Sequence, residues 1–150
     1  MIPTLEEILR MEEEMGIPLA QGLGRRVKKV GDFVVKRAIN KRGYAESKKE
    51  YNISKKLDSK YQKYIAPVYY YVEEEGVIVM PYAHELTQDE YIQEITRSKD
   101  FKNLHKELVM RFDIDDLDLY YYFNYGKLNG ETVLIDYGHV LDFGGDIYEY

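Results

Sequence analysis

The sequence predicts a mixed α+β protein: a five-stranded antiparallel sheet with one main helix, followed by a smaller part of two helices and a β-hairpin. Three observations predict this class, namely capping boxes ahead of amphipathic runs, short β-type runs broken by glycine, and one Asn-Gly dipeptide near the end. The 150 residues are 45% hydrophobic and 32% charged, an ordinary globular balance, so we expect 1–150 to form a single domain.

The first part of the chain alternates between helical and β-type patterns. A capping box at residues 4–7 opens an amphipathic run and predicts a short helix over 4–15. Residues 19–39 contain β-type runs broken by glycine turns, which predict three short antiparallel strands. Residues 44–62 are rich in helix formers and repeat apolar side chains near helical spacing, so they are expected to form the main helix.

The chain then returns to β structure before two further helices. Residues 67–74 and 76–83 have the composition of two strands around a tight turn, and they complete a sheet of five. A second capping box predicts a helix over 87–97. Ser98 is placed to cap the next helix, which we expect over 98–112.

A hairpin is predicted near the C-terminal end. Residues 120–128 and 131–137 flank Asn129-Gly130, the dipeptide that best suits a type I′ turn. Asn124 and Asp136 are twelve positions apart, so a hairpin between them can bring both side chains to one end. An amide and a carboxylate placed in this way are candidate ligands for magnesium.

Asp136 belongs to one of two similar triplets, each of which places an aromatic residue and a glycine after an aspartate. The first covers 136–138 and follows the apolar run Val133 to Ile135, and the second covers 142–144. Asp142 has no preceding hairpin with an Asn partner, and its Phe-Gly-Gly sequence is typical of a turn. Of the two aspartates, Asp136 is therefore the one that we expect to bind magnesium together with Asn124.

Candidate phosphate-binding residues lie in the first 50 positions. Gly22-Leu23-Gly24 opens a β-turn-β, although two glycines also serve an ordinary hairpin. Strand alternation points Lys36 to the same side as Val34, among apolar neighbours, and a solvated surface lysine is the alternative. Glu50 on the main helix is the favoured partner of Lys36, and Glu46, one turn earlier, is the second candidate.

Charge is distributed unevenly along a chain whose net charge is −6. Residues 25–63 hold fourteen Lys and Arg against four Asp and Glu, a balance of +10, whereas residues 76–150 hold six against fifteen, a balance of −9. The basic stretch would attract anions, but the acidic half would repel a phosphate backbone, so nucleic acid is not the expected partner.

No targeting or membrane segment is expected. The N-terminal run is acidic and amphipathic, unlike a signal peptide, and no stretch approaches the roughly 18 apolar residues of a membrane span. Cysteine is absent, which excludes disulfides and thiolate metal sites and fits a reducing compartment. We expect a cytoplasmic protein with no membrane association.

Two further features suggest metal binding only at first sight. The histidines His84, His105 and His139 are scattered and show no ligand spacing, so packing or surface roles are expected. The acidic cluster over 113–118 lacks the glycine and glutamate of a calcium-binding EF-hand loop. It is expected to be a solvated turn.

The motifs together resemble a minimal protein-kinase-like fold, and they are most similar to small kinase-like proteins of bacteriophage and prophage genomes. Those proteins share a GxGRxV…G(D/N)(Y/F)V(V/L)K start and an LIDYG finish, which here run from Gly22 to Gly138. The resemblance implies an N-lobe-like part over about 1–83 and a reduced C-lobe-like part over about 84–150.

The resemblance also implies a site for ATP and magnesium. Its residues would be Gly22 and Gly24 at the phosphates, Lys36 on them with Glu50 holding it, Met80 and Tyr82 in a hinge touching adenine, and Asn124 and Asp136 on magnesium. Asp118 is the nearest candidate for the catalytic base. The kinase loop puts that base five residues before the asparagine, which here is Leu119.

Three functions follow from this pattern. The displaced base and the short sequence after Gly138 favour a pseudokinase or binding module, phage-encoded, that modulates a host or phage protein through protein–protein contact. An ATP- and magnesium-dependent phosphotransferase acting on itself or a small substrate is the second. A structural or self-assembling protein is the third.

Overall fold

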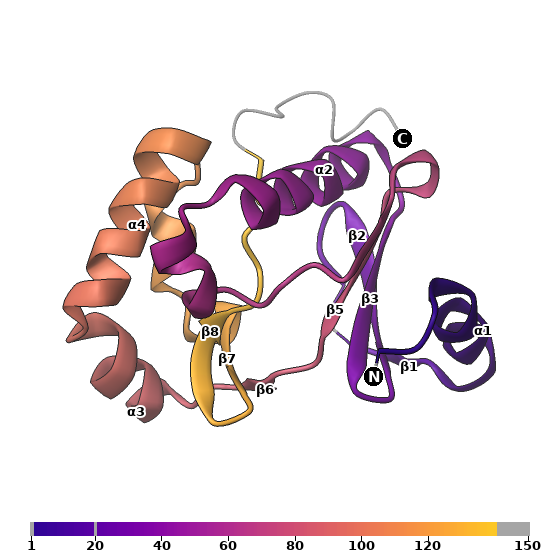
Figure 1. The fold of residues 1–150 in the computed structure, drawn as a ribbon, viewed down its shortest axis with the longest axis horizontal. Helices are drawn as coiled ribbons and strands as arrows, with labels where there is room; N and C mark the ends of the chain where they lie inside the picture. The colour runs from indigo at the N-terminus through magenta and orange to yellow at the C-terminus, as the bar shows by residue number, and fades with distance from the viewer. Residues whose placement is uncertain (1, 20, 141–150) are drawn as a thin grey trace.

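The computed structural model describes residues 2–19 and 21–140 and contains the expected five-stranded antiparallel sheet (Figure 1). The strands follow the order β1-β2-β3-β5-β4, and every neighbouring pair is antiparallel. They are β1 (Ile17–Pro18), β2 (Arg25–Val30), β3 (Phe33–Ala38), β4 (Tyr70–Val72) and β5 (Val77–Pro81). The α+β class is therefore confirmed, with the first strand two residues earlier than the stretch in which it was expected.

Helices cover both faces of this sheet. The helix α1 (Leu5–Met15) packs its Ile8 against Val35 and Val79 on one face, and all three side chains are fully buried. On the other face, Ile78 packs with Ile53 of α2 (Lys41–Lys56). Because successive residues of a strand point to opposite faces, β5 is buried along its whole length.

The main helix starts and ends earlier than the predicted range of 44–62, so that prediction was wrong at both ends. Asn40 caps α2, with its Oδ1 accepting a hydrogen bond from the Gly43 backbone N at 3.0 Å. The helix ends before Leu57, and a separate 3₁₀ helix follows over Ser59–Tyr64. Gly43 hides the true start from a propensity argument, because glycine weakens a helix but here permits the close approach of another chain segment.

The second part contains the two predicted helices. The helix α3 (Gln88–Tyr91) begins at the Thr87 capping box and continues as a π-helical turn over Ile92–Thr96. Ser98 caps α4 (Lys99–Phe112) by accepting a hydrogen bond from the Phe101 backbone N at 3.2 Å. The structure therefore confirms both helices close to their predicted bounds.

The hairpin is confirmed at its turn and wrong at its outer ends. Its strands are β7 (Tyr125–Leu128) and β8 (Glu131–Leu134), and β6 (His84–Glu85) joins them in a three-stranded sheet. Asn129 and Gly130 have φ values of 52° and 83°, both positive as a type I′ turn requires. The strand expected over 120–124 is instead made of 3₁₀ turns, and the strand expected to reach 137 ends at Leu134.

A shared core holds the two parts together. In Figure 1, α2 lies between the sheet and α4, and α4 forms the side of the molecule opposite the sheet. The larger core cluster includes Ile53 from α2, Met80 from β5, Leu104 from α4 and Leu134 from β8. None of the helices in the described part of the chain is long and apolar enough to cross a membrane.

Candidate functional site

A cleft of about 560 Å³ lies between the five-stranded sheet and the second part, a volume within the range of small-molecule sites. Residues 22, 36, 80, 82, 124 and 136 line it, so the cleft gathers Gly22, Lys36, Met80, Tyr82, Asn124 and Asp136. Three other predicted site residues, Gly24, Glu50 and Asp118, do not line the cleft. The fold thus brings together residues that are up to 114 positions apart in the sequence.

Lys36 on β3 is held in a fixed position at the back of this cleft. Its Nζ donates hydrogen bonds to Glu50 Oε1 at 3.0 Å and to the backbone carbonyl of Ile135 at 2.9 Å. The residue is only 6% exposed, so the alternative of a solvated surface lysine is wrong. Glu50, which is completely buried on α2, is the partner rather than Glu46.

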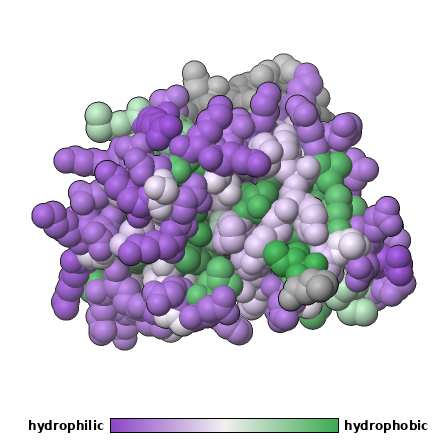
Figure 2. Space-filling view, in the orientation of Figure 1, coloured by the Kyte–Doolittle hydropathy of each residue, from purple (hydrophilic) through white to green (hydrophobic). Residues whose placement is uncertain are grey.

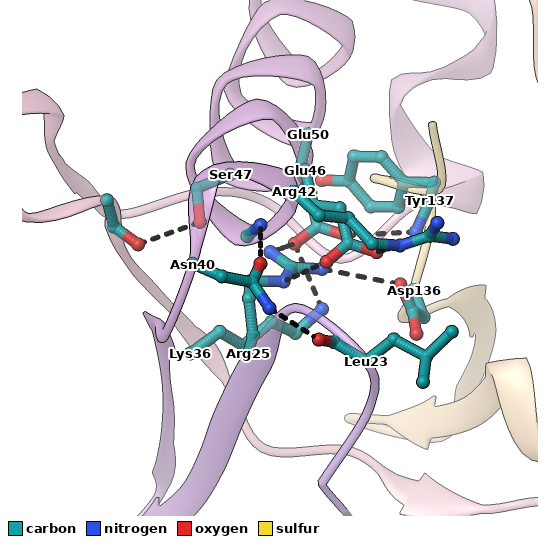
Figure 3. A network of polar contacts seen from close by, with 12 residues as sticks. Leu23, Arg25, Lys36, Asn40, Arg42, Glu46, Ser47, Glu50, Asp136 and Tyr137 are labelled. Atoms are coloured by element: carbon teal, nitrogen blue, oxygen red, sulfur yellow. Dashed lines mark hydrogen bonds and ion pairs between the residues drawn. The ribbon is translucent and has the colours of Figure 1, made fainter. Parts of the chain in front are cut away.

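Arg25 is a site residue that the sequence reasoning missed. Its Nη1 lies 3.0 Å from Glu50 Oε1, and its Nη2 lies 3.6 Å from Asp136 Oδ1. Figure 3 shows Arg25, Glu50 and Asp136 converging from β2, α2 and the segment after β8. A signal was present: Val27 pairs directly with Lys36 in the sheet, and alternation by two puts Arg25 on the same face.

The buried network is ionised at neutral pH. Burial by itself would raise the pKa of Glu50, but the charges of Arg25 and Lys36 and a hydrogen bond from the Tyr137 backbone N at 2.9 Å outweigh it, so the pKa falls to about 2. Burial likewise opposes the charge on Arg25, yet Glu50 and Asp136 raise its pKa. Arg25 and Lys36 are therefore both held in place by one ionised carboxylate.

The two glycines of the Gly22-Leu23-Gly24 stretch have different environments. A Cβ on Gly24 would collide with Glu46 Oε1 and would lie 2.8 Å from the Gly43 backbone N, so Gly24 permits close packing against the start of α2. Gly22 lies at the cleft with nothing within 4 Å of such a Cβ. Of the two, Gly22 is the one whose backbone faces the space that a ligand would occupy.

Asn124 and Asp136 both line the cleft, as the hairpin prediction required. The Asn124 side-chain Nδ2 donates to the Asp118 backbone carbonyl at 2.7 Å, and the Asn124 backbone carbonyl accepts from the Ile135 backbone N at 2.8 Å. The Asp136 side chain is 52% exposed. The first contact orients the side-chain amide of Asn124, and the Asp136 carboxylate is accessible. Both groups offer oxygen atoms of the kind that magnesium takes as ligands.

The protein supplies few other groups for a metal ion at this position. Within residues 2–19 and 21–140, no cluster of three or more His, Asp or Glu side chains could hold a metal. Magnesium commonly binds through one or two protein oxygens together with phosphate oxygens and water. Asn124 and Asp136 fit a cation that arrives with a phosphorylated ligand.

Asp118 sits outside the cleft, in a 3₁₀ turn over Asp116–Tyr120. Its Oδ2 accepts no hydrogen bond from the described residues and lies 3.3 Å from His139 Nε2. Burial raises the pKa of its carboxyl, while His139 opposes and Asp136 reinforces the shift. Leu119, which has the sequence spacing of a kinase base, is 1% exposed and part of the core.

The remaining sequence features have structural roles or lie elsewhere. His105 makes a 2.7 Å hydrogen bond with the Tyr125 hydroxyl, and burial lowers its pKa to about 4, so it packs as a neutral ring. Asp115 caps a 3₁₀ turn within the acidic cluster. The second triplet, 142–144, lies outside the described residues.

Comparison with known proteins adds no assignment to this geometry. No protein-family model matches the chain, and no curated protein matches it. A proposal of function therefore rests on the residues that meet in the cleft.

Proposed function

We propose that this chain is a kinase-like binding module, a pseudokinase whose cleft takes a nucleoside triphosphate with magnesium and whose surface contacts a protein partner. The observation that carries the proposal is the meeting of Gly22, Lys36, Asn124 and Asp136 in one cleft, while the sequence position of the base is occupied by the buried Leu119. The resemblance to phage-encoded kinase-like proteins suggests a host or phage protein as the partner.

The cleft residues suit the parts of such a ligand. Lys36, fixed by Glu50, offers a positive charge to phosphate oxygens, and Asn124 and Asp136 offer oxygen atoms to magnesium. Met80 and Tyr82 provide an apolar and an aromatic surface for the base. Bound magnesium would neutralise phosphate charge beside Asp136.

Charge in the cleft predicts that the nucleotide binds only with its cation. Among the described residues, two cations, Arg25 and Lys36, line it against three carboxylates, Glu46, Glu85 and Asp136, and Glu50 lies directly behind. A free triphosphate would meet a surplus of negative charge, whereas its magnesium complex brings compensating charge. Magnesium dependence is therefore part of the proposal.

Binding without phosphoryl transfer is favoured by the surroundings of Asp118 and Leu119. Catalysis by a base requires a carboxylate within hydrogen-bond reach of the attacking hydroxyl. Asp118 does not line the cleft, since its carboxylate lies beside His139, and Leu119 is enclosed in the core.

A phosphotransferase is the second candidate, and one observation favours it. The Asp118 backbone carbonyl accepts the Asn124 amide at 2.7 Å, so Asp118 is one hydrogen bond away from a residue that lines the cleft. Burial also raises the pKa of the Asp118 carboxyl, as is common for acid–base groups. A local shift of the 3₁₀ turn would be needed to bring that carboxylate into the cleft.

Thermal unfolding with and without millimolar ATP and magnesium tests the binding proposal. A ligand that binds only the folded state adds about 2.7 kcal/mol of stability at a hundredfold excess over Kd. We expect a magnesium-dependent rise in Tm for the natural sequence that is lost in Lys36→Met and in Asp136→Asn. Lys60→Met, which removes an exposed lysine outside the cleft, is the matched control and should keep the rise.

Two results separate the rival functions. Absence of any shift in the natural sequence would exclude nucleotide binding and leave the structural role. Phosphate release or self-phosphorylation that disappears in Asp118→Asn, while the Tm shift remains, would establish the phosphotransferase instead of the pseudokinase.

A further inference from the structure

A second hollow, of about 470 Å³, lies between α2 and the C-terminal end of α4. On α2, Lys48, Lys49 and Lys56 line it, on the side of the helix that points away from Glu50. Arg111 and Phe112 line it from α4, and Ile53 forms part of its floor. We name this hollow, defined by these six residues, the basic groove.

The four cations of this groove differ in their anionic partners. Within the described residues, Lys48 and Lys56 have no carboxylate partner, and Lys49 Nζ donates only to the backbone carbonyl of Asp113 at 2.9 Å. Arg111 pairs with Glu107 at 3.1 Å. Burial lowers the pKa of Lys49, and the charges of Asp113 and Asp118 partly oppose that shift. Since the chain as a whole carries −6, this local excess of positive charge stands out from the rest of the surface.

The groove combines charge with an apolar floor. Phe112 is half-buried and contributes the apolar surface, while Ile53 borders the hollow but is fully buried. The Arg111 guanidinium lies 5.0 Å from the centre of the Phe112 ring. Figure 2 shows that the surface over α2 and α4 is predominantly hydrophilic, with only small apolar areas between the polar side chains. A ligand with negative groups on both sides of one apolar group would match this arrangement.

The spacing of the lysines suits an extended peptide. Lys48 and Lys56 are eight positions apart on the helix, so their backbones lie about 12 Å apart along α2. Acidic residues four positions apart in an extended chain span about 13 Å, and the residue midway between them points to the same side. One such segment can therefore place two carboxylates on the lysines and one apolar side chain on the floor.

Polypeptide fits this surface better than nucleic acid does. Glu107 and Asp113 border the groove, and the acidic run continues through Asp115, Asp116 and Asp118. These carboxylates would repel a continuous phosphate backbone but leave room for a short acidic segment.

We infer that the basic groove is a docking site for an extended acidic segment of a partner protein, in which two carboxylates flank an aromatic or aliphatic side chain. The inference rests on the protein-binding part of the proposed function and specifies which side chains the partner would present. It requires no nucleotide in the cleft, so the two can fail separately.

The test measures binding of the fluorescein-labelled peptide Glu-Ser-Phe-Ser-Glu to the full chain by fluorescence anisotropy, without nucleotide. We expect saturable binding at low salt that weakens at about 300 mM salt, because exposed charges are then more strongly screened. Glu-Ser-Ala-Ser-Glu should bind several times more weakly, since it lacks the group for the floor. Lys-Ser-Phe-Ser-Lys should not bind.

The paired variants locate the site. Lys48→Glu with Lys56→Glu should weaken binding about tenfold or more, because two attractions become repulsions. Lys60→Glu with Lys63→Glu changes the net charge equally on exposed lysines outside the groove, and it should change Kd less than twofold. The Tm of each variant, measured in parallel, shows whether it is folded.

Three outcomes would overturn the inference. One is the absence of saturable binding of Glu-Ser-Phe-Ser-Glu at low salt by a folded chain. Another is an equal loss in both double variants, which would indicate general charge attraction. The third is tighter binding of a single-stranded DNA oligonucleotide at the same lysines, which would make the groove a nucleic-acid site. None of these results bears on the ATP-dependent Tm shift, so a failure here leaves the cleft proposal standing.

Discussion

Charged side chains on the two sides of α2 differ in burial and in ionic partners. On the inner side, Glu50 is completely buried and is shared by Arg25 and Lys36 at 3.0 Å each. On the outer side, Lys48 and Lys56 are exposed, and the described residues offer them no carboxylate. Residues only two positions apart on one helix therefore have entirely different electrostatic partners.

This difference shows what burial demands of a charge. A charge taken out of water is tolerated only when other charges and hydrogen bonds replace the lost hydration, so the inner side must be matched by the protein itself. An exposed lysine keeps its water and needs no internal partner. The charges on the inner side thus contribute to folding and to the cleft, whereas the exposed lysines on the outer side are available to bind another molecule.

The largest expected effect comes from removing the shared carboxylate. Glu50→Gln should lower the free energy of unfolding by about 3–5 kcal/mol, because Arg25 and Lys36 would remain buried without their anion. Urea denaturation measures it. Lys48→Gln on the outer side is the matched control, with an expected change within about 0.5 kcal/mol. Equal losses in the two variants would contradict the distinction between the two sides.

The second-largest effect is expected from acid, which should remove the stability that ionised Glu50 contributes on the inner side. The pKa of Glu50 is about 2 in the folded protein, below its ordinary value, so the stability it contributes is present above about pH 4.5 and is lost as pH falls toward 2. That loss amounts to about 3 kcal/mol. Urea denaturation from pH 6 to pH 2.5 should therefore show a steeper decline for the natural sequence than for Glu50→Gln. Parallel declines would mean that Glu50 is not held ionised.

The contact of the glycine stretch with the start of α2 provides a third test. Gly24→Ala should cost about 1–3 kcal/mol, because the added Cβ would meet Glu46 and the backbone of Gly43. Gly22→Ala is the control, since nothing lies within 4 Å of its added Cβ. Thermal unfolding of both variants measures the difference. Similar Tm values for the two would show that Gly24 has room for a side chain.

The smallest expected effect belongs to the outer side. Lys48→Gln combined with Lys56→Gln should change the free energy of unfolding by no more than about 0.5 kcal/mol, because neither lysine has a carboxylate partner in the described part of the chain. Any gain from reduced repulsion should shrink as salt is added. Urea denaturation at two salt concentrations checks this, and a loss above about 1 kcal/mol would reveal a stabilising contact of these lysines.

Local patterns predicted most of the elements. The capping boxes at Thr4 and Thr87 and the Asn129-Gly130 turn act over a few residues, so the sequence is enough to place them. The errors arose where distant contacts override local preference. The early start of α2 depends on Gly43 fitting against Gly24, nineteen positions away, and the 3₁₀ turns over 120–124 replace a stretch whose tyrosines favour a strand.

The candidate site was predictable to a similar degree. Strand alternation placed Lys36 among apolar neighbours, and the hairpin placed Asn124 with Asp136, and all three side chains line one cleft. Arg25 was missed because its value depends on two partners, Glu50 and Asp136, that lie 25 and 111 positions further along the chain. Asp118 was considered as a base because sequence distance cannot tell which way a turn directs a carboxylate.

The sequence by itself determined the α+β class, the order of most elements and the types of side chain available, because these depend on periodicity and on caps and turns of a few residues. Only the tertiary structure decided which charges are buried. It paired Lys36 with Glu50 and not with Glu46, added Arg25 to that pair, and left Lys48 and Lys56 of the basic groove without a carboxylate partner among the described residues. The physical reason is that desolvation depends on everything packed around a group, and packing joins residues far apart in the chain.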